Sequence, residues 1–196
     1  MSVIVGIKQD GKIYLGADSQ ITKGGTRLSL TNPNNYKIWK VIGEENCLMG
    51  CVGSLREACV VRIISDFIKK TDDGDNTIDF ECVVARIVPK IKAELEYYDY
   101  LDKDKVFDGF DSSYLFAHKD KLFFINSDGA VIEIDDCIAI GSGANESIGS
   151  LVTSIGEDPV ERIIKAIKAS AVHDIYVDYP IIITDTATTE FKIIDM

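Results

Sequence analysis

The order of apolar patterns along this chain restricts its fold more than any other sequence feature. Runs typical of strands come in three groups, and two pairs of segments with helical period separate them. This order is typical of helix pairs packed on both faces of two antiparallel sheets. The predicted strands cover residues 2–8, 13–19, 36–42, 47–53, 113–118, 121–126, 130–134, 137–140, 175–184 and 190–194, and the predicted helices cover 55–70, 78–98, 144–155 and 159–172.

We therefore expect an α+β fold, a four-layer α-β-β-α sandwich of two antiparallel sheets flanked by helix pairs. A chain of 196 residues that is 46% hydrophobic is long enough for one domain, here residues 1–196, with a sizeable core. Residues 20–35 are polar, include Gly24 and Gly25, and are predicted to form turns and irregular structure. Pro89 should kink or break its helix, and residues 113–140 should form one antiparallel meander.

Composition argues against several classes of protein. A net charge of −11 without a basic cluster disfavours nucleic acid or an anionic membrane as partner. The sequence has no apolar run of about 18 residues and no signal-peptide pattern at its start, so a cytoplasmic protein without a membrane span is expected. Five cysteines, an odd number without a C-x-x-C pair, argue against disulfides and against a zinc site. No cofactor and no metal are expected.

The two histidines offer little for a Ser-His-Asp mechanism. His118 lies in an apolar, strand-like run, and His173 lies beside Asp174. Both are interpreted as partly buried strand or strand-edge residues. If the chain is a hydrolase, this shortage favours a base other than imidazole.

Ser2 can supply both a nucleophile and a base. A small second residue is the kind that commonly follows a removed initiator methionine, and removal of Met1 would leave a hydroxyl and a free α-amine on Ser2. An α-amine has a pKa of ~7.7–8.0, so an appreciable fraction is neutral near pH 7. Taken alone, Ser2 is more typical of the first residue of an edge strand, and its interpretation depends on the rest of the chain.

Five motifs, none specific alone, occur in an order and at spacings that resemble one family over nearly the whole chain. The family is that of the proteasome β-type subunits and HslV-like peptidases, which are N-terminal nucleophile hydrolases. The motifs are Ser2 with its following strand, Gly16-Ala17-Asp18-Ser19, Lys37-Ile38, Gly50-Cys51-Val52-Gly53 before a helix, and Ala139-Ile140-Gly141-Ser142-Gly143 before another.

The resemblance implies a role for each matched residue. Ser2 would be the nucleophile, with its own α-amine as the base. Asp18 would orient Lys37, and Lys37 would lower the pKa of the amine and polarise the hydroxyl. The backbone N–H of Gly53 would donate to the developing oxyanion, a role for which glycine leaves room. Lys40 is three residues beyond Lys37, so strand alternation points the two lysines to opposite faces.

The resemblance also implies a polar network around the amine of Ser2. Ser142 would hydrogen-bond near that amine, and Asp174 would complete the network. Three residues after Asp174, where the family usually has a serine, this chain has Val177.

The function implied by the resemblance is hydrolysis of peptide bonds in a self-compartmentalised homo-oligomeric ring, fed with polypeptide substrates by an AAA+ unfoldase. Two alternatives remain open at the level of sequence. One is a non-catalytic proteasome-like subunit that keeps the fold and the ring. The other is a small-molecule amidase on the same fold.

Overall fold

Two five-stranded antiparallel sheets lie face to face in the computed structural model, which describes residues 2–29, 31–67, 78–99 and 109–195. The first sheet has the strand order β10-β1-β2-β11-β12 and the second has the order β5-β6-β7-β8-β9. The strands of the first sheet are β1 (Val3–Gln9), β2 (Lys12–Asp18), β10 (Cys137–Gly141), β11 (Ile181–Asp185) and β12 (Lys192–Ile194). Those of the second are β5 (Ile38–Lys40), β6 (Cys47–Val52), β7 (Ser113–His118), β8 (Lys121–Ile125) and β9 (Val131–Ile134).

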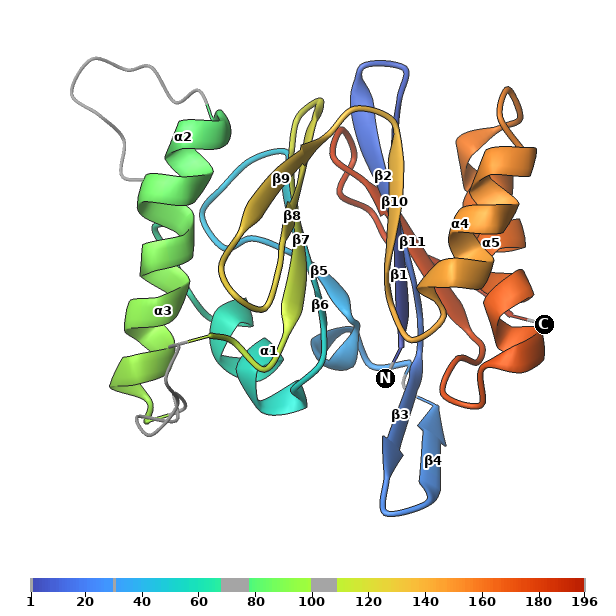
Figure 1. The fold of residues 1–196 in the computed structure, drawn as a ribbon, viewed down its shortest axis with the longest axis horizontal. Coiled ribbons are helices and arrows are strands. Elements are labelled where there is room, and N and C mark those ends of the chain that lie inside the picture. The colour runs from blue at the N-terminus through green and yellow to red at the C-terminus, as the bar shows by residue number, and fades with distance from the viewer. Residues whose placement is uncertain (1, 30, 68–77, 100–108, 196) are drawn as a thin grey trace.

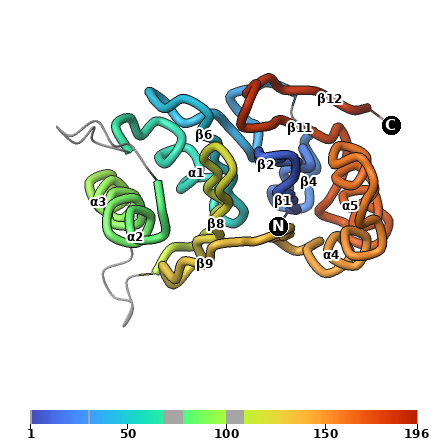
Figure 2. Tube along the Cα trace, turned by 90° about the horizontal axis from the view of Figure 1, so that it is seen from above, coloured from blue at the N-terminus to red at the C-terminus, as the bar shows by residue number. Residues whose placement is uncertain are grey.

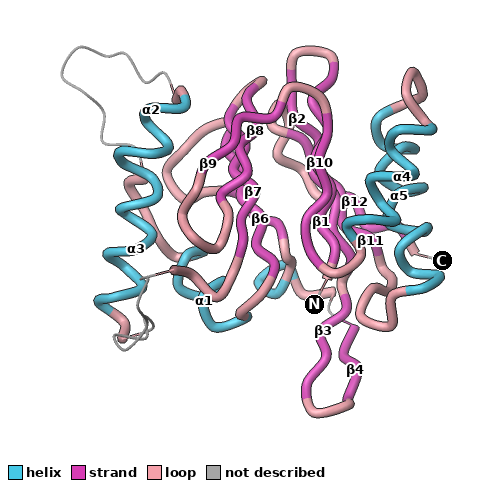
Figure 3. Tube along the Cα trace, in the orientation of Figure 1, coloured by secondary structure: helices cyan, strands magenta, loops and turns pink. Residues whose placement is uncertain are grey.

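Helices cover the outer face of each sheet (Figures 1 and 3). The second sheet is covered by α1 (Leu55–Arg62), α2 (Phe80–Cys82), a π-helical turn (Val83–Ile87) and α3 (Val88–Tyr97). The first sheet is covered by α4 (Ala144–Thr153) and α5 (Pro159–His173). Seen from above, the helices and sheets follow one another as four layers (Figure 2). The expected α+β sandwich is confirmed, whereas one domain over residues 1–196 stays a prediction.

Three hydrophobic cores separate the four layers. Strands with nearly continuous apolar sequence supply two cores at once, because successive side chains point to opposite faces. In β1, Val3 and Val5 pack toward α4 and α5, whereas Ile4 packs between the sheets. In β6, Leu48 packs between the sheets and Met49 packs toward the helices of the second sheet.

The polar stretch 20–35 is more regular than expected. It contains an antiparallel hairpin of β3 (Gln20–Lys23) and β4 (Thr26–Ser29), followed by a 3-10 turn at Pro33–Asn35. Gly24 and Gly25 form the hairpin turn and both have positive φ, which glycine adopts without strain. The hairpin projects from the body of the molecule at the end where the N-terminus lies (Figure 1).

The helix predicted over 55–70 was too long, since α1 ends at Arg62. Asp66 then takes a positive φ of 58°, and Ser65 forms an isolated bridge with Ile42. Tertiary contact therefore overrides the helical period of this segment. Residues 68–77, which include the predicted loop 71–76, lie outside the described residues. The kink or break expected at Pro89 takes the form of a π-helical turn just before it, where the N–H of Val88 donates to Val83 O, and the helix continues through Pro89 to Tyr97.

Two strand predictions need correction. The meander ends with β9, because β10 pairs with β1 and so belongs to the first sheet. The strand predicted over 175–184 begins only at Ile181. The preceding residues form a loop whose backbone contacts the end of β2: Ser19 N–H donates to Asp178 O at 3.2 Å.

Strand register brings the ends of several elements together at one end of the sandwich. Val3 pairs with Gly141 across β1 and β10, Ile4 pairs with Ala17 across β1 and β2, and Ile38 pairs with Gly50 across β5 and β6. Antiparallel pairing thus places the start of β1 beside the ends of β2 and β10. No helix in the described parts of the chain is long and apolar enough to cross a membrane.

Candidate active site

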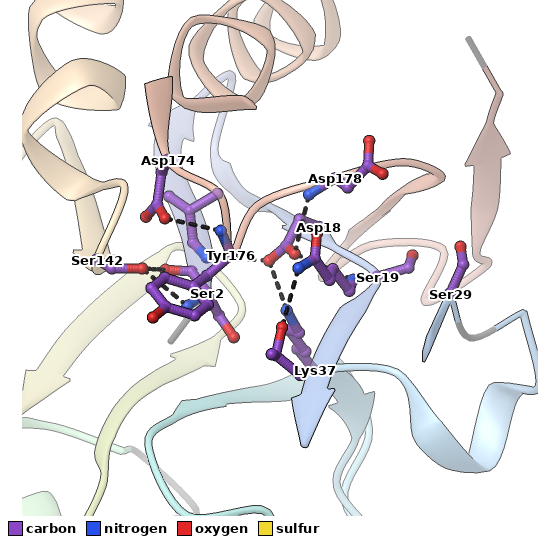
Figure 4. A network of polar contacts seen from close by, with 12 residues as sticks. Ser2, Asp18, Ser19, Ser29, Lys37, Ser142, Asp174, Tyr176 and Asp178 are labelled. Carbon is purple, nitrogen blue, oxygen red and sulfur yellow. Dashed lines mark hydrogen bonds and ion pairs between the residues drawn. The ribbon is translucent and has the colours of Figure 1, made fainter. Parts of the chain in front are cut away.

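Ser2 precedes β1 and is held by the turn that follows β10. Its backbone N–H donates to Ser142 Oγ at 3.1 Å, and the hydroxyl of Ser142 donates to Ser2 O at 3.3 Å (Figure 4). The N–H of Gly143 also donates to Ser2 O, at 3.4 Å. Gly141 is required here, because its φ is +104° and a Cβ would lie 2.1 Å from Ser2 O. The predicted contact between Ser142 and the nitrogen of Ser2 is thus present. Met1 lies outside the described residues, so its removal stays a prediction.

Asp18 and Lys37 form a buried ion pair beside Ser2. Lys37 Nζ lies 2.7 Å from Asp18 Oδ1, and both side chains are almost entirely removed from solvent. The same oxygen accepts the N–H of Val3 at 2.9 Å, so the pair is tied to the residue after Ser2. Asp18 Oδ2 accepts N–H groups from Gln20 at 3.1 Å and from Asp178 at 3.4 Å. These bonds hold the carboxylate in one orientation.

Burial sets the electrostatics of Lys37. It lowers the pKa of Lys37 below the ordinary 10.5, whereas the negative charges of Asp18 and Asp174 act to raise it. Burial likewise raises the pKa of Asp18, whereas the 2.7 Å contact between the two groups favours their charged forms. In its charged form Lys37 places positive charge next to Ser2. Lys40, as expected from alternation, is exposed on the other side of β5.

Gly53 joins β6 to α1 in a conformation that glycine favours. Its φ is +126°, and a Cβ there would lie 2.5 Å from Asp111 O and 2.7 Å from Ser112 Cα. Ser112 Oγ accepts the N–H of Ser54 at 2.9 Å, and Ser54 Oγ caps α1 by accepting the N–H of Glu57. The N–H of Gly53 itself donates to no other group in the parts of the chain that the structure describes. It is therefore available to a ligand.

Asp174 lies where α5 ends, close to Ser2 and Ser142 in the view of Figure 4. Its Oδ1 accepts the N–H of Tyr176 at 2.9 Å, while Oδ2 is buried and has no partner among the described residues. Within those residues no hydrogen bond joins Asp174 to Ser142. Asp174 therefore lies near the predicted network but is not bonded directly to Ser142. Val177 is buried in the core beneath α4 and α5.

A pocket with a volume of about 520 Å³ opens beside these residues. Ser2, Lys37 and Gly53 line it together with Gln20–Lys23 of β3 and the first turns of α1. It can therefore hold an extended ligand against both the Ser2 side and the Gly53 side. Among the described residues, no group of three or more His, Cys, Asp or Glu side chains is placed to hold a metal ion.

Sequence reasoning missed the residues that hold the site in place. Ser112 and the buried Glu57 support the Gly53 loop, since Glu57 accepts the N–H of Asp111 at 2.7 Å and the hydroxyl of Tyr114 at 2.9 Å. The N–H of Asp178 supports Asp18. Most of these contacts are to backbone atoms of distant segments, for which the sequence carries no signal.

Residues 2–183 match the sequence profile of the family described as "Proteasome subunit". This chain belongs to the proteasome subunit family. The match starts at Ser2 and includes all five motifs that carry the resemblance. Within the family the chain is HslV-like, and the resemblance stated from the five motifs is confirmed.

Curated relatives and solved structures agree with this assignment. The ATP-dependent protease subunit HslV of Petrotoga mobilis is 28% identical over 179 residues, which are 89% of this chain and 91% of the relative. HslV of Borreliella burgdorferi strain ZS7 is 29% identical over 146 residues, 74% and 71% of the two chains. Thiobacillus denitrificans BPH superposes with a TM-score of 0.74 at 20% identity, covering 93% and 96%. Eukaryotic HslV from Trypanosoma brucei gives 0.64 at 17% identity, covering 93% and 98%.

Proposed function

We propose that this subunit hydrolyses peptide bonds with Ser2 as an N-terminal nucleophile, exposed when Met1 is removed. The observation that carries the proposal is the buried Lys37–Asp18 pair, which is tied to Val3, the residue after Ser2, beside a pocket that Ser2, Lys37 and Gly53 line together. The names of the relatives, ATP-dependent protease subunits, support the same reaction.

In the proposed reaction the neutral α-amine of Ser2 takes the proton from Ser2 Oγ, and Oγ attacks the carbonyl carbon of the peptide bond. The positive charge of Lys37 lowers the pKa of that amine, so more of it is neutral near pH 7. The N–H of Gly53 donates to the oxyanion of the tetrahedral intermediate. The protonated amine then gives its proton to the leaving nitrogen, which leaves an ester on Ser2, and water hydrolyses this ester with the amine as base again.

Ser142 and Asp174 are proposed to position the amine. Ser142 Oγ already accepts from the nitrogen of Ser2 and donates to its carbonyl. Once Met1 is removed, this nitrogen becomes the amine, and the same hydroxyl can fix the direction of its lone pair. The buried, unpartnered Oδ2 of Asp174 can accept a hydrogen bond from the protonated form.

We further propose that the subunits assemble into a homo-oligomeric ring that receives polypeptides from an AAA+ unfoldase, in the cytoplasm. The relatives are named ATP-dependent, whereas the proposed chemistry on Ser2 uses no ATP. The requirement for ATP is therefore assigned to a partner. Mass measurement of the intact assembly tests the ring: a discrete oligomer is expected, and a monomer at working concentration contradicts this part of the proposal.

Replacement of Ser2 tests the reaction. Ser2→Ala should reduce peptide hydrolysis by about 10³-fold or more, because the covalent intermediate cannot form, and Ser2→Thr should retain activity. Ser150→Ala on α4 is the matched control and should behave as wild type. Absence of hydrolysis by wild type and Ser2→Ala alike would identify a non-catalytic subunit, whereas equal cleavage by both would reject Ser2 as the nucleophile. Cleavage of acylated amino compounds but not of peptides would identify a small-molecule amidase.

A further inference from the structure

The charged side chains that line the pocket are all basic. They are Lys23, Lys37, Arg56 and Arg62, in a chain that has 32 acidic and 21 basic residues overall. Lys37 is neutralised by Asp18, but the pocket as a whole keeps an excess of positive charge. The composition of the chain would favour the opposite sign, so the positive charge is a specific property of this pocket.

Arg62, the last residue of α1, is the half-buried cation of this group. Its guanidinium lies 4.7 Å from the centre of the Trp39 ring and donates to Pro33 O at 3.2 Å and to Tyr36 O. Within the described residues no carboxylate pairs with it. Burial lowers the pKa of Arg62, but a guanidinium stays protonated at neutral pH. Three of its five N–H groups remain beyond the two carbonyl contacts.

The rest of the pocket wall suits an aliphatic stem that ends in a carboxylate. Leu55 and Ala58 line the pocket, and Cys51 lines it as a neutral thiol because burial raises its pKa to about 12. Gly53 and Ser54 bring the N-terminus of α1 to the pocket, and the helix dipole there also favours negative charge. Apolar walls with a few convergent donors are the usual composition of a specific pocket.

We propose that the pocket selects peptides with an acidic side chain immediately before the cleaved bond, and that Arg62 is the residue that selects it. This inference rests on the proposed function, because the side chain nearest to the attacked carbonyl is the one that enters a pocket beside Ser2 and Gly53. The side chain of glutamate would run along Leu55 and Ala58 and place its carboxylate on the free N–H groups of Arg62. A charge-assisted pair of this kind is stronger than the bond that the isosteric glutamine could form.

The experiment uses peptides that are identical except for Glu, Gln, Leu or Lys before a fluorogenic leaving amine. The wild type should cleave the Glu peptide with a kcat/KM about tenfold above that of the Gln peptide at low ionic strength. The ratio should fall as salt is added, because the pair is partly exposed to solvent. A Gln or Lys peptide cleaved as well as the Glu peptide would overturn the proposal.

Arg62→Met tests the residue, since it keeps an unbranched stem over Trp39 and removes the charge. It should reduce the Glu to Gln ratio to near one, and Arg62→Lys should retain part of the preference. Lys40→Met removes the same charge from an exposed position outside the pocket and should leave both cleavage rates unchanged. A Glu preference that survives in folded Arg62→Met would overturn the assignment. If Arg62→Met does not fold, Arg62→Lys replaces it in the test. Equal cleavage of the Glu and Gln peptides by Arg62→Lys would then overturn the assignment.

Binding separates failure of this inference from failure of the proposed function. Fluorescence anisotropy with Ser2→Ala protein and labelled uncleaved Glu and Gln peptides needs no catalysis. The Glu peptide should bind about tenfold more tightly. Equal binding overturns the acidic preference even if the wild type is an active peptidase. If the wild type cleaves no peptide but Ser2→Ala protein still binds the Glu peptide more tightly, the pocket assignment is supported and the proposed reaction is rejected.

Discussion

At the scale of single residues, Lys37 is the group whose charge the proposed chemistry needs most. Burial lowers its pKa from the ordinary 10.5, and the carboxylates of Asp18 and Asp174 oppose that shift. Below its pKa Lys37 is charged and keeps the amine of Ser2 easier to deprotonate. Above its pKa that help is lost, so the rate should fall on the alkaline side earlier than it would for an exposed lysine.

Lys37→Met should therefore change the pH profile as well as the rate. Without the cation the pKa of the Ser2 amine rises, so the acidic limb of kcat/KM should move to higher pH, and the rate at pH 7 should fall by about 10²–10³-fold. Peptide cleavage measured from pH 5 to pH 10 checks both effects. Lys40→Met, at the exposed last residue of β5, is the matched control. An acidic limb that stays in place or moves to lower pH would contradict the role given to Lys37.

The sequence could predict these residues because each lies at the end of an apolar run. Ser2, Asp18 and Gly53 adjoin strands that the pattern identifies, and antiparallel pairing brings such ends together. Arg62 and Ser112 could not be predicted in the same way. Arg62 falls inside the helix predicted over 55–70, and its importance depends on where α1 ends and on its place above Trp39.

At the scale of elements, the junction from β6 through Gly53 to α1 combines a strand end, a tight turn and a helix N-terminus. Ser54 and Ser112 fix the helix side of the turn, and the buried Glu57 anchors the segment before β7. The turn places Gly53 in the wall of the pocket that Ser2 also lines.

Gly53→Ala should damage this junction in two ways. A positive φ and a Cβ at 2.5 Å from Asp111 O should cost about 1–3 kcal/mol of unfolding free energy, and displacement of the N–H should lower kcat by about 10²–10³-fold. Urea unfolding and peptide cleavage measure the two effects. Gly129 also has a positive φ, of +84°, but a Cβ there would meet only Val88 Cγ1, at an ordinary contact distance of 3.7 Å. Gly129→Ala should therefore cost about 1 kcal/mol with kcat intact. Full activity of folded Gly53→Ala would contradict the oxyanion role.

Element prediction failed where backbone contacts between distant segments decide the structure. The hairpin of β3 and β4 is exposed and polar, so periodicity gave no signal, although Gly24-Gly25 between two short runs was an available sign of a two-residue turn. The late start of β11 has no such sign. Residues 175–180 are apolar enough for a strand, but they begin with a turn, and their backbone carbonyls accept hydrogen bonds from Ser19 and Gln20.

At the scale of the whole molecule, the core between the two sheets connects the halves that carry the site. Leu115 of β7 is fully buried in this core, which also contains Ile4 of β1. The layer arrangement could be predicted from the order of elements, since paired helices between groups of strands have few ways to bury their apolar faces. The sheet to which β10 belongs could not, because pairing across 130 residues of sequence separation is not visible in a local pattern.

Leu115→Ala should lower the free energy of unfolding by about 2–5 kcal/mol, through lost burial and the cavity left between the sheets. Val152→Ala on α4 removes apolar atoms from an exposed side chain and should change stability by less than about 0.5 kcal/mol. Denaturant unfolding of both variants measures the difference. Similar stability of the two variants would contradict the position of the central core.

The central claim, that Ser2 acts through its own α-amine, is tested most directly by the intact mass of the protein expressed without an N-terminal tag. The account predicts an active peptidase whose mass is lower than that of the translated chain by one methionine residue, so that the chain begins at Ser2. A chain that keeps Met1 and still cleaves peptides would contradict the account, because the nitrogen of Ser2 would then be an amide that cannot act as a base.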